Sequence, residues 1–283
     1  MRTLVHLSDL HFGRVAHALV APLSEMIGRI KPDVVVVSGD LTQRARTEQF
    51  KEARRFLDSL PTPQIVVPGN HDVPLYDIFS RLLQPLDKYR RYITNTLEPF
   101  YTDEAIAVLG INTARSLTFK RGRINEQQIA SARMLLCPLS ADVTKIIVTH
   151  HPFDLPDGYE DREIVGRARM AMEMFASCGA DLFLAGHLHI SHIGNTAARY
   201  KINGHSALVV QAGTATSTRG RGESNAFNVI RISHPHISIE RLTWQPELGT
   251  FVLSMTESFE HNSSGWSRVW NRNFSGLIGP KQE

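Results

Sequence analysis

The chain has 283 residues, of which 42% are hydrophobic and 21% charged, a composition typical of a globular protein with a substantial core. Its 31 basic and 28 acidic residues give a formal net charge of +3, a balance too even to indicate nucleic-acid binding. The chain starts on a strand pattern without a secretory leader and has no run of 18 apolar residues, so we expect a cytoplasmic, non-membrane protein.

Through the first two thirds of the chain, apolar runs alternate with amphipathic segments. Strands are predicted at residues 2–7, 33–38, 64–67, 105–111, 145–149 and 181–185. Helices are predicted at residues 15–30, 47–60, 125–136 and 162–178, with residues 74–92 helical in whole or in part. Asn125 and Gln128 form a capping-box pattern at the start of the helix at 125–136.

The pattern changes after residue 189. Strand-like segments follow at residues 207–212, 226–233 and 236–244, and we expect them to form a second sheet. Alternating apolar residues at Ile237, Ile239 and Leu242 indicate half-buried antiparallel strands. From residue 246 the chain contains Gly, Ser and Asn with three isolated aromatic anchors, Trp266, Trp270 and Phe274. We therefore divide the chain into a domain at 1–245 and a C-terminal extension at 246–283.

Five short polar clusters carry side chains that can bind a metal, and four of them follow directly on an apolar run. They are Asp9-Leu10-His11, Gly39-Asp40, Gly69-Asn70-His71-Asp72, His150-His151-Pro152 and Gly186-His187-Leu188-His189. Asp9 and His11 are two residues apart, so on an extended backbone they project to one side and can share an ion. One such pair often occurs by chance, but the occurrence of all five clusters in one chain is improbable by chance. We expect buried parallel strands to bring them to one edge of a sheet, as a dispersed metal site.

In this order the clusters resemble the calcineurin-like metallophosphoesterases, whose pattern is D-x-H, G-D, G-N-H-D/E, H-x-P and G-H-x-H. All five elements are present. The resemblance spans residues 4–189, and extends more loosely to residues 211–214. It implies an α/β fold, a four-layer α/β/β/α metallophosphoesterase sandwich with two mixed sheets and its site at the strand ends. Residues 1–245 would be the catalytic domain, and we expect residues 246–283 to cap the site or to mediate homodimer formation.

The resemblance also implies two metal sites that share one carboxylate. The first would use Asp9, His11, Asp40 and His189, and the second Asp40, Asn70, His150 and His187. His71 would stay free as the catalytic histidine that faces the phosphate. A hydroxide that bridges two divalent cations would attack phosphorus. Ligands without thiolate fit Mn, Fe, Zn or Co and do not choose among them.

Several other side chains have weaker predicted roles. His151 is expected beside the metal ligands or the substrate, and Asp72 is expected to orient its turn. His6 is expected to be packed inside its strand, and His192 and His205 to lie on the surface. Reduced, packed cysteines are expected, because Cys137 and Cys178 have no spacing typical of a disulfide framework or a thiolate metal site. The arginines that could contact substrate are Arg115, Arg121, Arg123, Arg219 and Arg221.

The substrate depends on the loops, because one metal core can hydrolyse monoesters, diesters and nucleic acids. The chain is most similar to the bacterial class III cyclic nucleotide phosphodiesterase and glycerophosphodiesterase branch, through D-L-H-F-G, G-N-H-D-V-P and H-H-P. We expect a small phosphodiester substrate, selected by the segment at 152–165. A DNA exonuclease of the double-strand-break repair type, a phosphomonoesterase and a non-catalytic scaffold are the alternatives. Charge balance disfavours the exonuclease, and the intact ligand set disfavours the scaffold.

Overall fold

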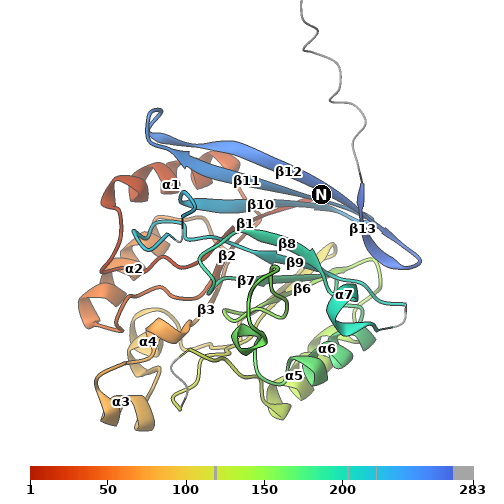
Figure 1. Cartoon of the computed structure of the whole chain (residues 1–283), viewed down its shortest axis with the longest axis horizontal. Helices are drawn as coiled ribbons and strands as arrows, with labels where there is room; N and C mark the ends of the chain where they lie inside the picture. The colour runs from red at the N-terminus through yellow and green to blue at the C-terminus, as the bar shows by residue number, and fades with distance from the viewer. Residues whose placement is uncertain (118–119, 203, 221, 270–283) are drawn as a thin grey trace, which may run out of the picture.

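Two β-sheets form the centre of the molecule and helices cover their outer faces (Figure 1). The computed structural model describes residues 1–117, 120–202, 204–220 and 222–269. The first sheet has the spatial order β13 (Gly265–Val269), β12 (Thr250–Asn262), β11 (His236–Gln245), β10 (Ala226–Ser233), β1 (Arg2–Leu7), β2 (Val34–Ser38) and β3 (Gln64–Val67). The second has the order β4 (Phe100–Thr102), β5 (Ile106–Gly110), β6 (Thr144–Val148), β7 (Leu182–Ala185), β9 (Leu208–Gln211) and β8 (His192–Asn195).

Both sheets are mixed. In the first, β1, β2 and β3 are parallel, whereas β10 to β13 pair antiparallel. In the second, β5, β6, β7 and β9 are parallel, and β4 and β8 are antiparallel edge strands. Among the described residues, no helix has the length and apolar character needed to cross a membrane.

The helices lie in two outer layers. The residues of α1 (His17–Ile30), α2 (Thr47–Asp58) and α4 (Asp87–Tyr92) contribute to the core on the outer face of the first sheet. The residues of α5 (Glu126–Leu136), α6 (Ala168–Ser177) and α7 (Ala197–Tyr200) contribute to the core on the outer face of the second. A short helix, α3 (Ile78–Leu83), precedes α4. A third core lies between the two sheets.

Strand β2 shows why the sequence forms these layers. Val34 and Val36 pack into the core between the sheets, whereas Val35 and Val37 pack against the helices. A strand that is buried on both faces needs apolar side chains at every position, which produces a continuous run of valines. The predicted four-layer α/β/β/α sandwich with two mixed sheets is confirmed.

The strands after residue 189 are present, but the prediction that they form a sheet of their own is wrong. Strand β9 joins the second sheet, parallel to β7. Strands β10 and β11 extend the first sheet beside β1, with Val5 opposite Val229. Strand β11 is antiparallel to both of its neighbours, as the alternation at Ile237 and Ile239 predicted. An apolar pattern specifies a strand and its buried face, but it does not specify which neighbouring strand it will join.

The segment at 246–283 contains two strands of the first sheet. Strand β12 pairs with β11 along nearly its whole length, and β13 pairs with β12. Trp266 is buried between the sheets, in agreement with its prediction as an anchor, whereas Trp270 and Phe274 lie outside the described residues. The expected capping or dimerisation role of this segment stays a prediction.

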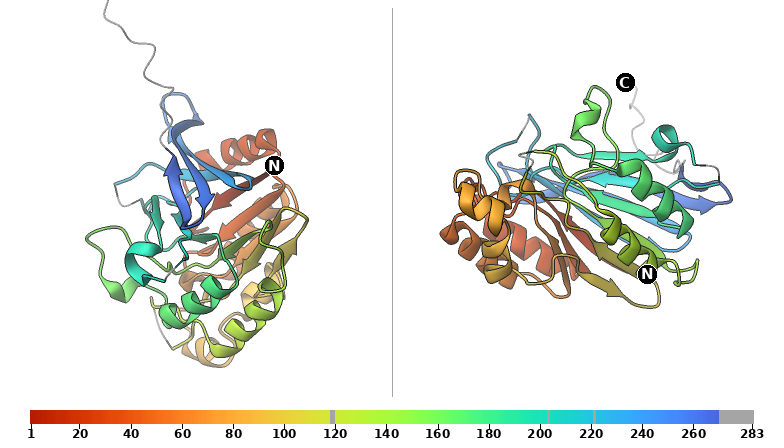
Figure 2. Two further views of the ribbon diagram at one scale, coloured as in Figure 1. Left: turned by 90° about the vertical axis from the view of Figure 1, so that its right-hand side faces the viewer. Right: turned by 90° about the horizontal axis from the view of Figure 1, so that it is seen from below.

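Two further expectations need correction. The helix predicted at 162–178 begins later, at Ala168, and is preceded by a single 3-10 turn at Asp161–Glu163. Cys137 and Cys178 are joined in a disulfide, so the expectation of reduced cysteines is wrong. Their 41-residue separation gives no local signal, because they meet only through the packing of α5 against α6, which lie side by side in Figure 2.

Candidate metal centre

The five polar clusters meet where strands of both sheets end. Asp9, Asp40 and Asn70 follow β1, β2 and β3 of the first sheet, whereas His150 and His187 follow β6 and β7 of the second. The clusters were expected at one edge of a single sheet. Instead, they lie where the edges of two sheets that pack face to face meet. Their strand ends converge because the core between the sheets holds the sheets against each other.

Five of the seven predicted ligands have a left-handed backbone conformation. Their φ angles are +51° at Asp9, +50° at His11, +51° at Asp40, +73° at His187 and +58° at His189. Non-glycine residues rarely adopt this region, and each such residue costs on the order of 1 kcal/mol. Strain of this kind persists where surrounding structure enforces it, and it concentrates at functional sites.

Two glycines make room for these side chains. Gly39 has a φ of +93°, and a Cβ atom there would lie 2.6 Å from Nδ1 of His150. A Cβ atom on Gly69 would overlap the carboxylate of Asp40. The backbone at these two positions therefore comes close to His150 and Asp40 only because both residues are glycine.

The first predicted metal site is compact. Nε2 of His189 lies 3.2 Å from Oδ1 of Asp9 and 3.1 Å from Nε2 of His11. Nε2 of His11 lies 3.6 Å from Oδ1 of Asp9 and 3.7 Å from Oδ2 of Asp40. One ligand atom from each of these four side chains lies within 4.8 Å of the others, so one cation could contact all four.

The second predicted site lies on the other side of Asp40. Oδ1 of Asp40 is 3.4 Å from Nε2 of His150. Oδ1 of Asn70 is 3.1 Å from this Nε2 and 3.1 Å from Nδ1 of His187. The two carboxylate oxygens of Asp40 therefore face different ligand sets, an arrangement in which Asp40 could contact both cations.

The electrostatics of the cluster suit cations. Oδ1 of Asp9 is buried and has no hydrogen-bond partner among the described residues. Burial opposes ionisation of Asp9, but the charge of His189 and the proximity of the His11 and His189 rings hold the pKa of Asp9 well below the usual range. Burial likewise opposes protonation of His150, yet Asp40 raises the pKa of His150 to about 9. Buried carboxylates need compensating positive charge, so the donor set fits divalent metal ions.

Two ligand histidines are anchored through their second ring nitrogen. Nδ1 of His150 donates to the carbonyl of Ser38 at 2.8 Å, and Nδ1 of His189 donates to the carbonyl of Arg219 at 3.1 Å. A carbonyl only accepts, so Nδ1 of each ring carries a proton, and Nε2 is the nitrogen that faces the centre and can bind a cation once it is deprotonated. Such anchors fix the ring orientation of metal ligands.

His71 lies beside the centre but outside the two ligand sets. Nδ1 of His71 donates to the carbonyl of Gln43 at 2.9 Å. Its Nε2 therefore carries a lone pair and accepts from Nη1 of Arg219 at 3.1 Å. The ring of His11 is 5.0 Å away. This position matches the predicted phosphate-facing histidine, whose catalytic role stays a prediction.

His151 is close to the second ligand set but is bound elsewhere. Grouping by proximity alone would place its ring with those of His150 and His187. However, Nε2 of His151 donates to the carbonyl of Lys120 at 2.9 Å, and Nδ1 accepts from Oγ1 of Thr113 at 2.8 Å. Both ring nitrogens of His151 are thus occupied by hydrogen bonds, and neither is available to a cation.

Asp72 connects the loops after β2 and β3. Its carboxylate accepts from the backbone N–H groups of Leu41, Thr42 and Gly69 at 2.8 to 3.1 Å. Burial and the charge of Asp40 raise the pKa of Asp72 to about 7, although the backbone donors act in the opposite direction. Its position agrees with the predicted orienting role.

The remaining histidines fall into two groups. His6 is buried in β1, where its Nε2 lies 2.9 Å from Oγ of Ser38 and burial lowers its pKa to about 3, so its prediction as a packed histidine is confirmed. His192 and His205 are half-buried. The expectation of surface positions for this pair is wrong, because His192 lies in β8 and His205 just precedes β9, both strands of the second sheet.

Two neighbours of the centre escaped prediction. Oε2 of Glu163 lies 3.2 Å from Nε2 of His187, and Gln43 orients His71. The only signal in the sequence was that Glu163 falls in the segment at 152–165, which was expected to select the substrate. Gln43 occupies no motif position. Both contacts join segments far apart in the chain, for which no local pattern exists.

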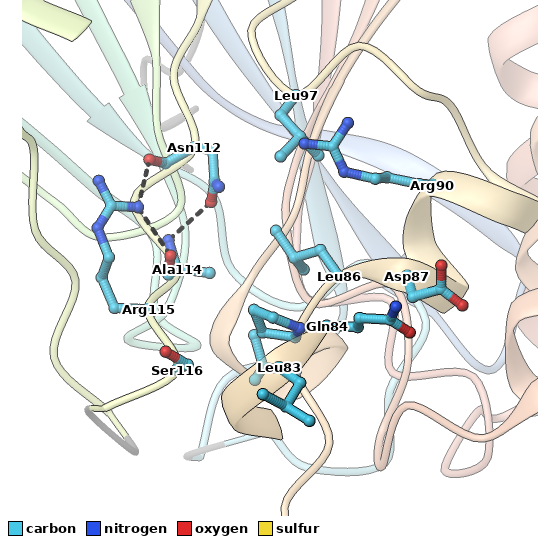
Figure 3. A pocket seen from close by; sticks show the side chains of 12 residues that line it. Leu83, Gln84, Leu86, Asp87, Arg90, Leu97, Asn112, Ala114, Arg115 and Ser116 are labelled. Carbon is cyan, nitrogen blue, oxygen red and sulfur yellow. Dashed lines mark hydrogen bonds between the residues drawn. The ribbon is translucent and has the colours of Figure 1, made fainter. Parts of the chain in front are cut away.

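Another cavity, of about 430 Å³, lies between the α3–α4 segment and residues 112–116 (Figure 3). Arg115 lines this cavity, and its Nη1 donates to the carbonyls of Asn112 and Ala114 at 3.1 and 2.8 Å. Its guanidinium is thereby held against the backbone. No predicted metal ligand lines the cavity, so we assign it no part in the centre. Arg221 lies outside the described residues, and Arg219 is the predicted arginine that contacts His71.

Comparisons with known proteins agree with this geometry. Residues 2–191 match the model of the calcineurin-like phosphoesterase family. The chain is 28% identical over 169 residues to the glycerophosphodiester phosphodiesterase GpdQ of Enterobacter lignolyticus, covering 56% of this chain and 60% of that protein. It is 27% identical over 198 residues to a probable cyclic nucleotide phosphodiesterase of Rhodopseudomonas palustris, covering 65% and 70%. The chain thus spans about three fifths of the length of the first relative.

A solved structure with a similar fold is a dimetal phosphatase from Danio rerio. The TM-score is 0.58 at 15% identity, and the match covers 85% of this chain and 95% of that one. At this identity the likeness concerns the fold. The match at 2–191 includes every predicted metal ligand and both sheets of the sandwich contribute to it, so the chain belongs to the calcineurin-like phosphoesterase family.

Proposed function

We propose that this protein is a dinuclear metal-dependent phosphodiesterase that hydrolyses a small phosphodiester, such as a cyclic nucleotide or a glycerophosphodiester. The observation that carries the proposal is the placement of Asp40. Its Oδ2 faces His11 at 3.7 Å, while its Oδ1 faces His150 at 3.4 Å. When bound, two divalent cations of the Mn, Fe, Zn or Co type supply charge that offsets the phosphate and lower the pKa of water.

The residues of the chain bind and orient these components. Asp9, His11 and His189 would hold the first cation together with Asp40, and Asn70, His150 and His187 would hold the second with the same carboxylate. Hydrogen bonds to backbone carbonyls fix His150 and His189, so little rearrangement is needed on binding. No side chain has to attack phosphorus.

His71 serves the leaving group. The carbonyl of Gln43 holds its ring, and Nε2 points toward the cavity that it shares with Arg219. With protons on both ring nitrogens and its contact with Arg219 released, His71 could donate from Nε2 to a phosphate oxygen or deliver that proton to the departing alkoxide. General acid catalysis of this kind contributes roughly a hundredfold or more to the rate.

The phosphodiesterase names of two relatives support a diester substrate. A DNA exonuclease is the nearest alternative. The nearly even numbers of basic and acidic residues, with a net charge of only +3, disfavour it. A panel of cyclic nucleotides, glycerophosphodiesters, monoesters and single-stranded DNA with Mn²⁺ separates these functions through kcat/KM. A preference for DNA that weakens steeply with salt would overturn the proposal.

We expect Asp40→Ala and Asn70→Ala to abolish hydrolysis of bis(p-nitrophenyl) phosphate and to retain less metal. Changes in groups that only support metal ligands already cost about 10- to 100-fold, so removal of a ligand should cost more. Metal content by mass spectrometry and kcat/KM check this, with Asp142→Ala as the control, because Asp142 is exposed. Full activity in the two ligand variants would contradict the two-metal assignment.

His71→Ala should behave differently. We expect kcat to fall by roughly a hundredfold, while both metals remain bound, because His71 contacts Gln43 and Arg219 and belongs to neither ligand set. The measurement pairs kcat with metal content of the purified protein. A variant that loses a metal would show that the role assigned to His71 is wrong.

A further inference from the structure

A cavity of about 240 Å³ adjoins the candidate metal centre on the side of Asn70 and His71. Three cationic side chains line it, Arg44, Lys120 and Arg219, and none of its lining residues is acidic. Its volume lies below the roughly 300 Å³ at which pockets for larger ligands begin. It therefore suits one small group of a bound molecule.

Arg219 is built into this wall. Its carbonyl accepts from Nδ1 of His189 at 3.1 Å, and its backbone N–H donates to Oγ of Ser217 at 3.1 Å. These bonds fix the backbone beside a predicted metal ligand. The side chain is half-buried, and its Nη1 lies 3.1 Å from Nε2 of His71 and 3.5 Å from Oε1 of Gln43. The guanidinium is thus held at the junction of the cavity and the centre.

Arg44 and Lys120 complete the cationic lining. The guanidinium of Arg44 lies 5.5 Å from the centre of the Tyr76 ring, and Lys120 is exposed. In the part of the chain that the structure describes, none of the three cations has a carboxylate within 4.0 Å. Three cations around one small cavity repel one another, and an anion placed among them offsets that repulsion.

We infer that this cavity binds an anionic group on the alcohol portion of the substrate, so that among small phosphodiesters the preferred one carries a second negative charge beside the scissile phosphate, which a simple cyclic nucleotide lacks. The inference rests on the proposed function. The scissile diester has a single negative charge, which two divalent cations already offset, and it does not account for three more. A carboxylate or a phosphate would form charge-assisted hydrogen bonds with Arg219 and Arg44.

Two synthetic diesters isolate this charge. 4-Carboxyphenyl p-nitrophenyl phosphate and 4-carbamoylphenyl p-nitrophenyl phosphate have nearly the same shape, but only the first carries the additional anion. Chromatography of both phenol products measures hydrolysis whichever phenol leaves. With Mn²⁺, we expect kcat/KM of the wild-type protein to favour the carboxylate ester by roughly tenfold, mainly through KM.

Variants locate the source of the preference. Arg219→Met should lower the ratio between the two esters by about threefold, because Arg44 and Lys120 remain, and Arg219→Met combined with Arg44→Met should bring the ratio to within about twofold of unity. Arg219→Lys keeps a charge without the planar fork and should give an intermediate ratio. The control is Arg14→Met, because Arg14 is exposed and does not line the cavity. Arg219 contacts His71, so absolute rates will fall as well, and the ratio removes that common effect.

The outcomes separate the two proposals. A wild-type ratio near unity, or a ratio unchanged in Arg219→Met, would overturn the anionic-group inference while hydrolysis of both esters still supported the phosphodiesterase. Failure to hydrolyse either ester with any of the four metals would overturn the proposed function, and this inference with it.

Discussion

Glu163 shows how one side chain outside the motifs can control a predicted metal ligand. Its Oε2 accepts from Nε2 of His187 at 3.2 Å. This bond leaves the lone pair on Nδ1 of His187, which faces Asn70 at 3.1 Å. The hydrogen bond from His187 lowers the pKa of Glu163, so the carboxylate stays ionised. An ionised acceptor on the far nitrogen makes an imidazole a stronger metal ligand.

We therefore predict that Glu163→Gln weakens the second metal site by roughly tenfold. A neutral amide accepts a hydrogen bond less strongly than a carboxylate, so the ring of His187 is held less firmly in the variant. Competition with a chelator measures metal affinity directly, without reliance on activity. The matched control is Glu160→Gln, because Glu160 is exposed on the same loop and pairs with Arg162. Equal affinities in the two variants would refute this role.

At this scale, the sequence indicates which side chains converge where a motif lies directly after a buried strand, while their role as ligands stays a prediction. Asp9, Asp40 and His187 follow runs of apolar residues, and the strand ends carry them to one place. Glu163 and Gln43 lie in loops, and their partners are distant in the chain. Their positions depend on how the two sheets pack, which no local pattern encodes.

At the scale of elements, the sequence predicts most strands and helices but not their partners. The helix at Glu126–Leu136 begins as predicted, with Oδ1 of Asn125 accepting from the N–H of Gln128 at 2.8 Å. Strands β9 and β10 are both almost entirely buried, yet they join different sheets. Burial sets the hydrophobic pattern, whereas the sheet assignment follows from the loops that connect the strands.

The disulfide between Cys137 and Cys178 links the C-terminal ends of α5 and α6. It closes a loop with a sequence separation of 41 residues, and the chain-entropy estimate for such a loop is about 4 kcal/mol. We predict that Cys137→Ser with Cys178→Ser lowers the free energy of unfolding by about this amount in urea titrations. The wild-type protein under reductant should match the double variant. Identical unfolding midpoints with and without reductant would disprove the contribution.

At the scale of the whole molecule, one contact links the two sheets at the strand ends opposite the candidate metal centre, between Trp266 and Asp181. Strand β13 belongs to the first sheet, but Trp266 reaches into the core between the sheets. Its Nε1 donates to Oδ1 of Asp181 at 2.8 Å, and Oδ2 of Asp181 accepts from the N–H of Lys145 at 2.8 Å. Lys145 lies in β6 and Asp181 directly precedes β7, both strands of the second sheet. The chain after residue 246 therefore contributes directly to the packing of the two sheets.

Trp266→Phe tests this contribution because it keeps an aromatic ring and removes the donor. A buried acceptor that loses its partner costs about 2 kcal/mol, so the free energy of unfolding should fall by about that amount. Trp244→Phe is the control: Trp244 is half-buried and packs on Phe251, and its loss should cost less than about 1 kcal/mol.

The pH dependence of the same variant gives a sharper test of the contact. Burial raises the pKa of Asp181, against the donors Lys145 and Trp266, so ionisation of Asp181 weakens the folded state as pH rises through that pKa. Removal of the Trp266 donor raises the folded pKa further, whereas the unfolded pKa is unchanged. The stability deficit of Trp266→Phe should therefore grow between pH 4 and pH 8 in urea titrations. A deficit that is constant over this range would mean that Trp266 stabilises the sandwich by packing alone, without its bond to Asp181.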